Sequence, residues 1–433
     1  MNTFISPRSA RRQALWLLLC SFLVTSCLDH QPPTSSDATG FSADVVTSWL
    51  TLQLRLNQPA PVSQPLVARR FAYSGIALYE SIAPGLAGYQ SIAPQLNGLT
   101  GLPTVTPNAR YYWPACANAA MAAMSRSQFP NASAALKTAI DSLEAANTVL
   151  YRKESSGEEL NRSAEFGKKI AAAVFEWSKS DGFDNPTPYS LPVGAQYWVP
   201  TPPAFGPPAL PHYGKCRTLV ANSDAGAEQG DPIPYSEDIN SAYYAQVKEL
   251  YDISKTLTDD QRAMANFWPD NLWHNVLSQV LALEKPKLDV AAVAFAQLGI
   301  AMSDGAVSLF KGKYRYVGVR PVTYIRTVMN HPAWNTVIPT PAHPEYPSGH
   351  SVMSAAAAQT LTLIFGANYP YTDKPFNVPG VSPRSYKSFE EAASEASKSR
   401  LYAGIHYRKT CEVSLVQGKT IANTIGQKLK FKK

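Results

Sequence analysis

The sequence predicts an all-α protein, built as a helical bundle with long proline-rich loops. Hydrophobic residues make up 45% of the 433 residues and charged residues only 16%, which is typical of a protein with a large buried core. Apolar residues recur at spacings of three and four along most of the chain. Period-two alternation is rare outside residues 314–319, where we expect a short strand. The 35 prolines, against 24 glycines, indicate ordered loops between the helices.

The chain begins with a segment that has the features of an export signal. Three arginines precede an apolar stretch at residues 14–24 that is too short to span a bilayer. The segment ends in Val24-Thr25-Ser26-Cys27, which resembles the lipobox of bacterial lipoprotein signal peptides. The resemblance implies removal of residues 1–26, lipidation of Cys27, and an exported protein anchored by lipid to a membrane of the bacterial cell envelope. An ordinary signal peptide with a chance cysteine is the alternative.

Three regions follow this signal segment. Residues 27–40 are polar and contain prolines, which predicts a flexible tether. Residues 41–235 form an N-terminal helical region and residues 236–433 a C-terminal helical region with the candidate site; we expect one compact unit. Apolar periodicity and terminal signals predict helices at residues 41–56, 67–82, 113–124, 132–150, 158–178, 238–254, 258–267, 271–283, 288–310, 348–365 and 389–405.

Two segments differ from this amphipathic pattern. Residues 185–234 are rich in proline and in bulky aromatics such as Trp198, which predicts an ordered loop packed over the helices and covering a cleft; a plain linker is the alternative. Residues 288–310 are apolar on nearly every face, which predicts a helix buried inside the bundle. Asp304 interrupts this helix. We expect it either to orient a cation of the site or to lie at the surface near the helix end.

Charge and cysteine content argue against two classes of function. The formal net charge of +7 includes the arginines of the signal segment and a basic tail at residues 428–433, which we expect to be solvated, with contact with anionic lipid as the alternative. No basic stretch is interleaved with aromatic residues, so we expect no nucleic-acid partner. Cys116, Cys216 and Cys411 can form at most one disulfide, and the absence of a CxxC pair argues against a zinc site built on cysteines.

The motif Pro347-Ser348-Gly349-His350 stands at the head of an alanine-rich apolar run. Proline and serine are typical of a helix start, and we expect Ser348 to cap the helix. The free N–H groups and the positive dipole end of a helix start favour a bound anion, and Gly349 lets it approach the backbone closely. His350 would then be placed to transfer a proton. A capped helix start with a nearby histidine is often only structural.

Three cations and a second histidine accompany this motif within about a hundred residues. Lys313 and Arg320 precede it, and Arg400 and His406 follow it. With Ser348 and the N–H of Gly349, these cations would make a site for a tetrahedral oxyanion.

The spacing of these residues resembles a known signature. Six residues separate Lys313 from Arg320-Pro321, the Pro347–His350 motif follows, and five residues separate Ser399-Arg400 from His406. This pattern is similar to that of type 2 phosphatidic acid phosphatases (PAP2) and vanadium-dependent haloperoxidases, and segments near Arg69, Trp198 and Trp268 resemble the larger bacterial haloperoxidase-related proteins. The resemblance implies an all-helical bundle of the PAP2/vanadium haloperoxidase type with the anion site at its core.

The same resemblance implies a role for each site residue. Lys313, Arg320, Ser348, Gly349 and Arg400 would bind the oxygens of vanadate or phosphate. His350 would be the acid/base residue, and His406 would coordinate vanadium or, in a phosphatase, attack phosphorus.

Two further positions bear on the chemistry. His343 lies seven residues before His350, where algal bromoperoxidases carry a histidine and a fungal chloroperoxidase an aromatic residue, so bromide is favoured over chloride. The family usually has an acidic residue four positions after its second histidine, whereas this chain has Thr410. A carboxylate partner raises the basicity of a histidine, so its loss at position 410 argues against efficient nucleophilic catalysis by His406.

Three hypotheses follow. The first is a vanadate-dependent haloperoxidase that oxidises halide with hydrogen peroxide. The second is an acid phosphatase of the PAP2 superfamily, which needs no cofactor, acts on a phosphate ester and uses His406 as nucleophile. The third is a non-catalytic surface lipoprotein that binds an oxyanion.

Overall fold

The computed structural model describes residues 37–58, 63–228, 230–269, 272–376 and 378–433. Cys27, the predicted signal segment 1–26 and most of the predicted tether lie outside these residues. The last four tether residues, 37–40, are described, and they pack against the domain: Ala38 is buried and donates its N–H to the carbonyl of Gly85. The described residues all fall in one compact unit, which is mainly helical as predicted.

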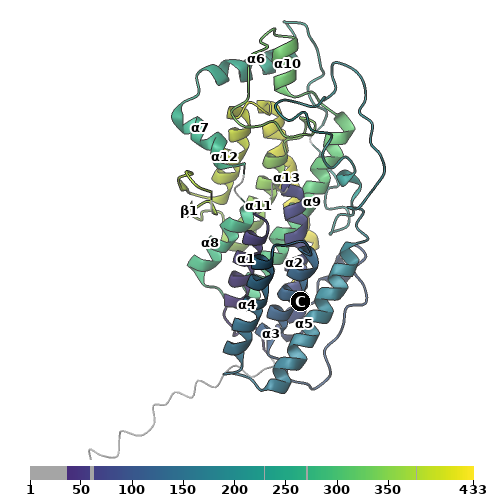
Figure 1. Ribbon diagram of the computed structural model, residues 1–433, viewed down its shortest axis with the longest axis vertical. Helices are drawn as coiled ribbons and strands as arrows, with labels where there is room; N and C mark the ends of the chain where they lie inside the picture. Colours follow the sequence, from purple (N-terminus) through teal and green to yellow (C-terminus); the bar gives the residue numbers. More distant parts are fainter. Residues whose placement is uncertain (1–36, 59–62, 229, 270–271, 377) are drawn as a thin grey trace, which may run out of the picture. The chain divides into compact units, whose positions relative to one another are not determined.

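The elements follow one another in two groups along the chain (Figure 1). The first group is α1 (Asp44–Leu56), α2 (Gln64–Ile82), η1 (Ala83–Gly85), η2 (Ala93–Gln95), α3 (Trp113–Gln128), α4 (Ala134–Tyr151) and α5 (Gly157–Ser178). The second is η3 (Tyr213–Lys215), α6 (Ala242–Lys255), α7 (Asp259–Phe267), α8 (Trp273–Glu284), α9 (Leu288–Tyr316), α10 (Pro321–Thr327), α11 (Gly349–Phe365), β1 (Tyr371–Asp373), β2 (Arg384–Tyr386), α12 (Phe389–Tyr402) and α13 (Arg408–Lys428). β1 and β2 pair antiparallel, with Tyr371 opposite Tyr386.

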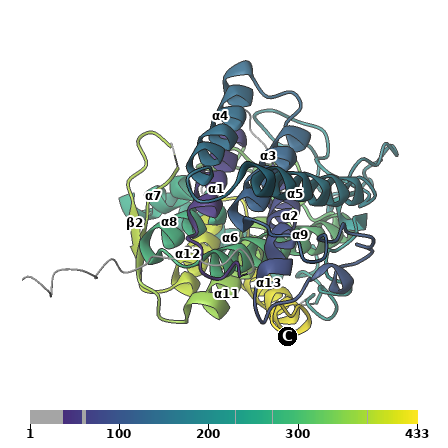
Figure 2. The ribbon, with the colours of Figure 1, turned by 90° about the horizontal axis from the view of Figure 1, so that it is seen from below.

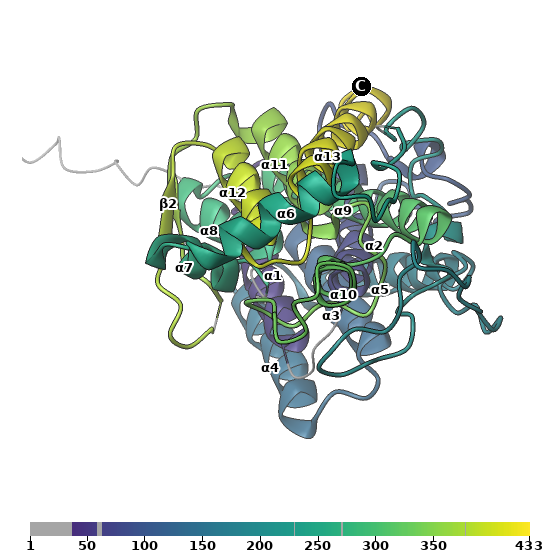
Figure 3. The same cartoon turned by 90° about the horizontal axis from the view of Figure 1, so that it is seen from above.

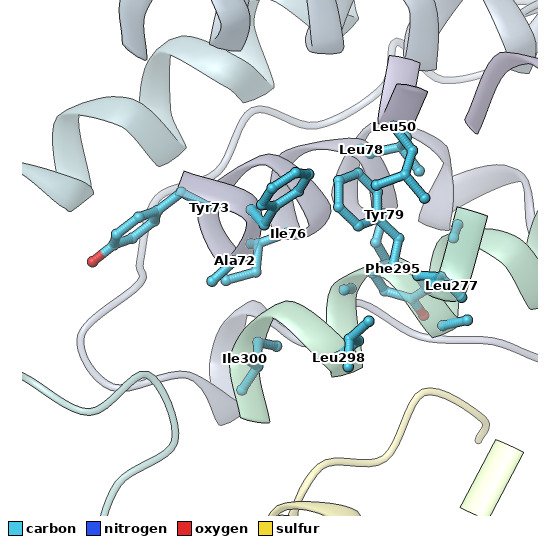
Figure 4. Packing of buried hydrophobic residues seen from close by; sticks show 14 of the residues in the cluster. Leu50, Ala72, Tyr73, Ile76, Leu78, Tyr79, Leu277, Phe295, Leu298 and Ile300 are labelled. Atoms are coloured by element: carbon cyan, nitrogen blue, oxygen red, sulfur yellow. The ribbon is translucent and has the colours of Figure 1, made fainter. Parts of the chain in front are cut away.

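Helices α2 and α9 join the two groups through a close contact (Figure 4). A Cβ atom added at Gly299 of α9 would lie 2.7 Å from the Cα atom of Ala72 in α2, so only glycine permits this approach. Phe295 of α9 lies on one side of the contact, with its ring 6.0 Å from that of Phe71 in α2. The two helices therefore share one continuous core, which α3 and α5 extend on the far side of α2 (Figure 2).

Helix α9 is the central helix of the site-bearing half. It is long and apolar enough to cross a membrane, but 89% of its most apolar window is buried inside the protein, which makes it a core helix as predicted. The predicted strand at residues 314–319 is wrong. The helix continues to Tyr316 and ends at Val317, which adopts a left-handed conformation with φ of 50°. Only Gly318 pairs in strand fashion, through an isolated bridge to Tyr197.

Asp304 anchors the proline-rich loop to α9. Its carboxylate accepts hydrogen bonds from the N–H of Leu219 (2.6 Å), the N–H of Val220 (3.0 Å) and the hydroxyl of Ser223 (2.7 Å). The loop thus packs on the helices as predicted. Neither expectation for Asp304 is correct, because this buried carboxylate is satisfied by loop donors rather than by a site cation or by solvent.

The basic tail is docked through its apolar residues, while its four lysines are exposed to solvent as predicted. Phe431 is buried, with its ring 4.9 Å from that of Tyr79, and Lys428 donates to the carbonyls of Ala221 and Asn222. Helices α10 and α13 are absent from the predicted set. α13 mixes polar and small residues, and its identity as a helix becomes evident from its packing against α11.

Candidate oxyanion site

The candidate site lies where the C-terminal end of α9 and the start of α11 meet the turn between α12 and α13. Helix α11 packs on α9, α12 and α13, which brings these four ends together. Helices α6 and α7 cross over α12 at this end of the bundle (Figure 3). The site is therefore assembled by the bundle itself and covered by the helices and loops above it.

Ser348 occupies the N-cap position of α11, but its hydroxyl forms no capping bond. The hydroxyl oxygen instead accepts a hydrogen bond from Ser351 at 2.8 Å, while the N–H of Ser348 donates to Ser414 at 2.9 Å. The expected capping role is thus wrong, because the Ser348 oxygen accepts from Ser351 and from no main-chain N–H of the helix start. Since that oxygen acts as an acceptor, the hydroxyl proton of Ser348 is left to donate to another group.

Arg320 is fully buried and connects two predicted site histidines. Its Nη1 lies 3.2 Å from Nε2 of His406 and 2.8 Å from the carbonyl of Ile405. Its Nη2 lies 3.0 Å from Nδ1 of His343, and its Nε donates to the carbonyl of His343 at 2.9 Å. An arginine has no acceptor, so both histidine nitrogens that face it carry lone pairs.

Lys313 is buried beside Arg320 and points at the loop before α11. Its Nζ donates to the carbonyls of Pro344 (2.8 Å), Glu345 (3.3 Å) and Pro347 (2.6 Å). Burial and the neighbouring Arg320 charge hold the pKa of Lys313 well below its usual range. Here the ammonium group fixes the loop that leads into α11; its binding of an oxyanion stays a prediction.

Arg400 comes from α12 and is also buried. Its Nε donates to the hydroxyl of Ser399 at 2.9 Å, and its Nη2 donates to the carbonyl of Ala265 at 3.3 Å. The charge of Arg400 helps to lower the pKa of both His350 and His406. Lys313 acts on the same two histidines, so the charges of both residues are felt at the same site.

His406 lies in the turn before α13 and is held from both sides. Its Nδ1 is 2.9 Å from Oε1 of Glu345, opposite the contact of Nε2 with Arg320. Burial, followed by the charges of Arg320 and Lys313, keeps the pKa of His406 well below its usual range. The ring is therefore neutral. Because Nε2 faces a donor, the proton resides on Nδ1 and is donated to Glu345.

Glu345 is not among the predicted site residues. It is buried, and besides His406 it accepts from the N–H of Tyr407 (3.2 Å) and from the hydroxyl of Thr410 (3.1 Å). Burial raises its pKa to about 7, while Arg320 and Lys313 act in the opposite direction. The sequence does contain a signal for Glu345, since it is a carboxylate two residues before Pro347. The family pattern points instead to position 410, four residues after His406, where this chain has threonine.

His343 and His350 interact electrostatically with each other and with Lys313. His343 is neutral, because burial and the charges of Lys313 and Arg320 lower its pKa, and its ring packs edge-on against Phe310 at 5.6 Å. Burial, with Arg400 next in importance, lowers the pKa of His350 to about 3.

The two nitrogens of His350 differ in their surroundings. The main-chain carbonyls of Pro269 and Trp268 accept from this ring, whereas Nε2 is buried without a hydrogen-bond partner. The carbonyls must therefore face Nδ1–H, which leaves the Nε2 lone pair available as a base.

These features fit a tetrahedral oxyanion better than a bare metal cation. Among the described residues, no group of three or more His, Cys, Asp and Glu side chains is placed to hold a metal ion. The site instead combines three buried cations with two neutral histidines that each present a nitrogen lone pair. Vanadate and phosphate are the anions that such a donor set suits, since cations bind their oxygens and His406 Nε2 can bind the central atom.

Comparisons with known proteins agree with this geometry. A family model described as "VCPO second helical-bundle domain" matches residues 293–431, which include every predicted site residue from Lys313 to His406. No curated protein sequence matches the chain.

Solved structures extend the similarity to nearly the whole chain. The crystal structure of the first bacterial vanadium-dependent iodoperoxidase is 29% identical, covers 91% of this chain and 98% of its own, and superposes with a TM-score of 0.82. The holo-type structure of a bacterial vanadium-dependent chloroperoxidase is 17% identical, covers 87% of this chain and 94% of its own, and has a TM-score of 0.67. The apo-type structure of a bacterial vanadium-dependent chloroperoxidase is 16% identical, covers 91% of this chain and 100% of its own, and has a TM-score of 0.69.

Fold and site together resemble those of vanadium haloperoxidases. The chain is similar to this class of protein in residues 293–431, by the family model, and over most of its length, by the solved structures.

Proposed function

We propose that the protein is a vanadate-dependent haloperoxidase that oxidises halide ions with hydrogen peroxide. The observation that carries this proposal is the geometry of His406, whose Nδ1 faces the Glu345 carboxylate and whose Nε2 faces the buried guanidinium of Arg320. This nitrogen would bind vanadium, and the oxygens of vanadate would be held by Arg320, Arg400, Ser348, Gly349 and Lys313. Bound vanadate would supply a Lewis-acidic centre that activates hydrogen peroxide towards halide.

The protein's own groups would place charge and protons around this centre. The guanidinium groups and the helix start of α11 would balance negative charge on the oxygens without needing a protonated histidine. The Nε2 of His350, which has no partner, would accept a proton from the incoming peroxide and return it later. His406 would keep its proton on Nδ1 throughout, because Glu345 accepts it there.

His343 supports a halide that is more readily oxidised than chloride. Its Nδ1 lies 3.0 Å from Nη2 of Arg320, which can only donate, and 3.3 Å from the carbonyl of Pro344; the shorter contact favours a ring proton on Nε2. Such a donor would favour an anion beside the oxyanion site. We propose bromide as a substrate over chloride, and we include iodide because the 29% identical structure is that of an iodoperoxidase.

The experiment is a paired assay on the mature protein. Peroxide-dependent oxidation of iodide, bromide and chloride is measured with and without orthovanadate, alongside hydrolysis of a phosphomonoester by the same samples. The proposal predicts halide oxidation that requires vanadate and is lost in His406→Ala. Vanadate binding with no turnover of any halide would favour a non-catalytic oxyanion-binding protein instead.

Phosphomonoester hydrolysis is the second candidate, and one contact favours it. A histidine that attacks phosphorus needs a carboxylate partner, and Glu345 supplies one despite Thr410. The objection that position 410 raises against a phosphatase is therefore removed. Hydrolysis by vanadate-free protein that disappears in His406→Ala, without halide oxidation in loaded protein, would reverse the order of the two proposals.

We also propose that the mature protein is anchored to a membrane of the bacterial envelope through lipid on Cys27. The support is the sequence Val24-Thr25-Ser26-Cys27 after an apolar stretch. Intact mass of the mature protein should show an N-terminal diacylated cysteine, and Cys27→Ala should shift the protein from the membrane to the soluble fraction. A mature N-terminus at any other residue contradicts this proposal.

A further inference from the structure

Glu345 is buried, and its carboxylate accepts three hydrogen bonds, one of them from His406. The residue is 3% exposed, and both of its carboxylate oxygens accept hydrogen bonds. Oε1 accepts from Nδ1 of His406 at 2.9 Å and from the N–H of Tyr407 at 3.2 Å. Oε2 accepts from the hydroxyl of Thr410 at 3.1 Å. Three donors thus converge on one carboxylate from the turn and first helical residues that carry His406.

We propose that Glu345 is the positioning residue of His406, and that Thr410 acts by holding Glu345 rather than by contacting the histidine. This inference rests on the proposed oxyanion chemistry of His406. It assigns the carboxylate partner to the loop before α11, whereas the family pattern places an acidic residue at the position of Thr410 on α13.

The hydrogen-bond directions support this assignment. Arg320 has only donors, so it fixes a lone pair on Nε2 of His406 and leaves the ring proton on Nδ1. Glu345 is the acceptor of that proton, and it therefore stabilises the tautomer that presents Nε2 to the site. Without an acceptor at Nδ1, only the contact with Arg320 would oppose the alternative tautomer, so the two tautomers would come closer in free energy.

The main chain of Glu345 is fixed as firmly as its side chain. Its carbonyl accepts from Lys313 at 3.3 Å, and the carbonyls of Pro344 and Pro347 accept from the same ammonium group. Its N–H donates to the carbonyl of Gly318. A site cation therefore holds the loop that delivers the carboxylate, so Lys313, Glu345 and His406 form one connected unit.

Two variants separate a positioning role from simple filling of the core. Glu345→Gln keeps the size of the side chain but removes its charge, and Glu345→Ala removes the acceptor altogether. Glu80→Gln is the matched control, because Glu80 is also 3% exposed and accepts two main-chain N–H groups, from Ile92 and Ala93, far from His406 in sequence. The double variant Glu345→Ala with Thr410→Asp moves a carboxylate to the position that the family pattern uses.

The first measurement needs no vanadate. Nitrogen-15 NMR of histidine-labelled protein, with the His406 signals assigned by their loss in His406→Ala, reports which ring nitrogen carries the proton. The proposal predicts a single Nδ1–H tautomer in the wild type and in Glu80→Gln, and a mixture of tautomers in Glu345→Ala. If that variant does not fold, Glu345→Gln is the variant that decides, with a weaker Nδ1–H signal expected.

The second measurement is the affinity for orthovanadate by calorimetry. We expect Glu345→Gln to bind about 10- to 100-fold more weakly than the wild type, Glu80→Gln to bind equally well, and the double variant to recover part of the loss. An unchanged His406 tautomer together with unchanged affinity in the Glu345 variants would overturn the proposal. If wild-type protein does not bind vanadate, the proposed function fails, while the tautomer measurement still decides the role of Glu345.

Discussion

Arg320 donates through Nη1 to Nε2 of His406 across 3.2 Å, so the nitrogen at the centre of the site carries a lone pair. This contact defines the state in which His406 can bind an electron-deficient centre. It also means that an arriving oxyanion and His406 compete for the same guanidinium group. The predictions below begin from this arrangement.

Removal of His406 should abolish tight binding of vanadate while leaving the fold intact. The ring contributes a ligand nitrogen, and the surrounding cations alone give only oxygen contacts. We expect His406→Ala to weaken orthovanadate binding by about 100-fold or more, measured by calorimetry. His331→Ala, which removes a half-buried histidine stacked on Tyr251, serves as the control. Equal affinity in the two variants would show that His406 is not a ligand.

His350 should affect turnover far more than affinity. Its unpartnered Nε2 is suited to transfer a proton, and its removal leaves the cations of the site in place. We expect His350→Ala to lower the rate of halide oxidation by about 10²- to 10⁴-fold, with orthovanadate affinity within about threefold of the wild type. A parallel loss of affinity and rate would instead mean that His350 holds the anion.

Ser351 should influence the site through Ser348. Its hydroxyl donates to the Ser348 oxygen at 2.8 Å and thereby leaves the Ser348 proton for the anion. We expect Ser351→Ala to weaken orthovanadate binding by about 3- to 10-fold, which corresponds to the net value of one hydrogen bond. Thr362→Ala, a half-buried position near the other end of α11, should leave the affinity unchanged. An effect of the same size in both variants would contradict this account.

Asp304 should be important for stability rather than for chemistry. Its removal leaves three donors of the proline-rich loop without their acceptor inside the protein. We expect Asp304→Ala to lower the free energy of unfolding by about 2–5 kcal/mol in denaturant titrations, and to increase proteolysis near Ser223. Asp252→Ala, at an exposed position, should change it by less than about 0.5 kcal/mol. Undiminished stability in Asp304→Ala would show that the loop is held elsewhere.

His274 should make the protein sensitive to acid. Burial lowers its pKa from 6.5 to about 3, and its ring stacks on Phe71 with centroids 3.9 Å apart. Between these values the unfolded chain binds a proton that the folded protein does not, so stability falls as the pH decreases from 6.5 towards 3. At about pH 5 the loss is about 2 kcal/mol. His274→Phe should flatten this part of the stability–pH curve, and an unchanged slope would contradict the assignment.

The fold and much of the site could be predicted from the sequence because both depend on local patterns. The continuous apolar run of α9 is visible in the sequence, as are the apolar periodicity and the capping and breaking residues of the other long helices. The site cations and histidines stand at fixed spacings within one stretch. Helix α13 was missed because its polar and small residues show no strong periodicity, and Gly418 meets the α11 backbone at Val352 only in the folded bundle.

The parts of the site that the sequence does not predict are contacts between segments far apart in the chain. Glu345 and His406 are 61 residues apart, and only the meeting of α11 and α13 brings them to 2.9 Å. The three donors in the proline-rich loop that bind Asp304 lie more than eighty residues from it in sequence. No spacing rule within a single chain predicts such pairs, since the register is set by how the bundle packs.

The most direct test of the central claim is the initial rate of iodide and bromide oxidation by hydrogen peroxide as orthovanadate is added to metal-stripped protein. The account predicts a rate that rises with vanadate, saturates near one equivalent per chain, and is absent in His406→Ala. A wild-type protein that oxidises neither halide at any vanadate concentration, from acid to neutral pH, would contradict it.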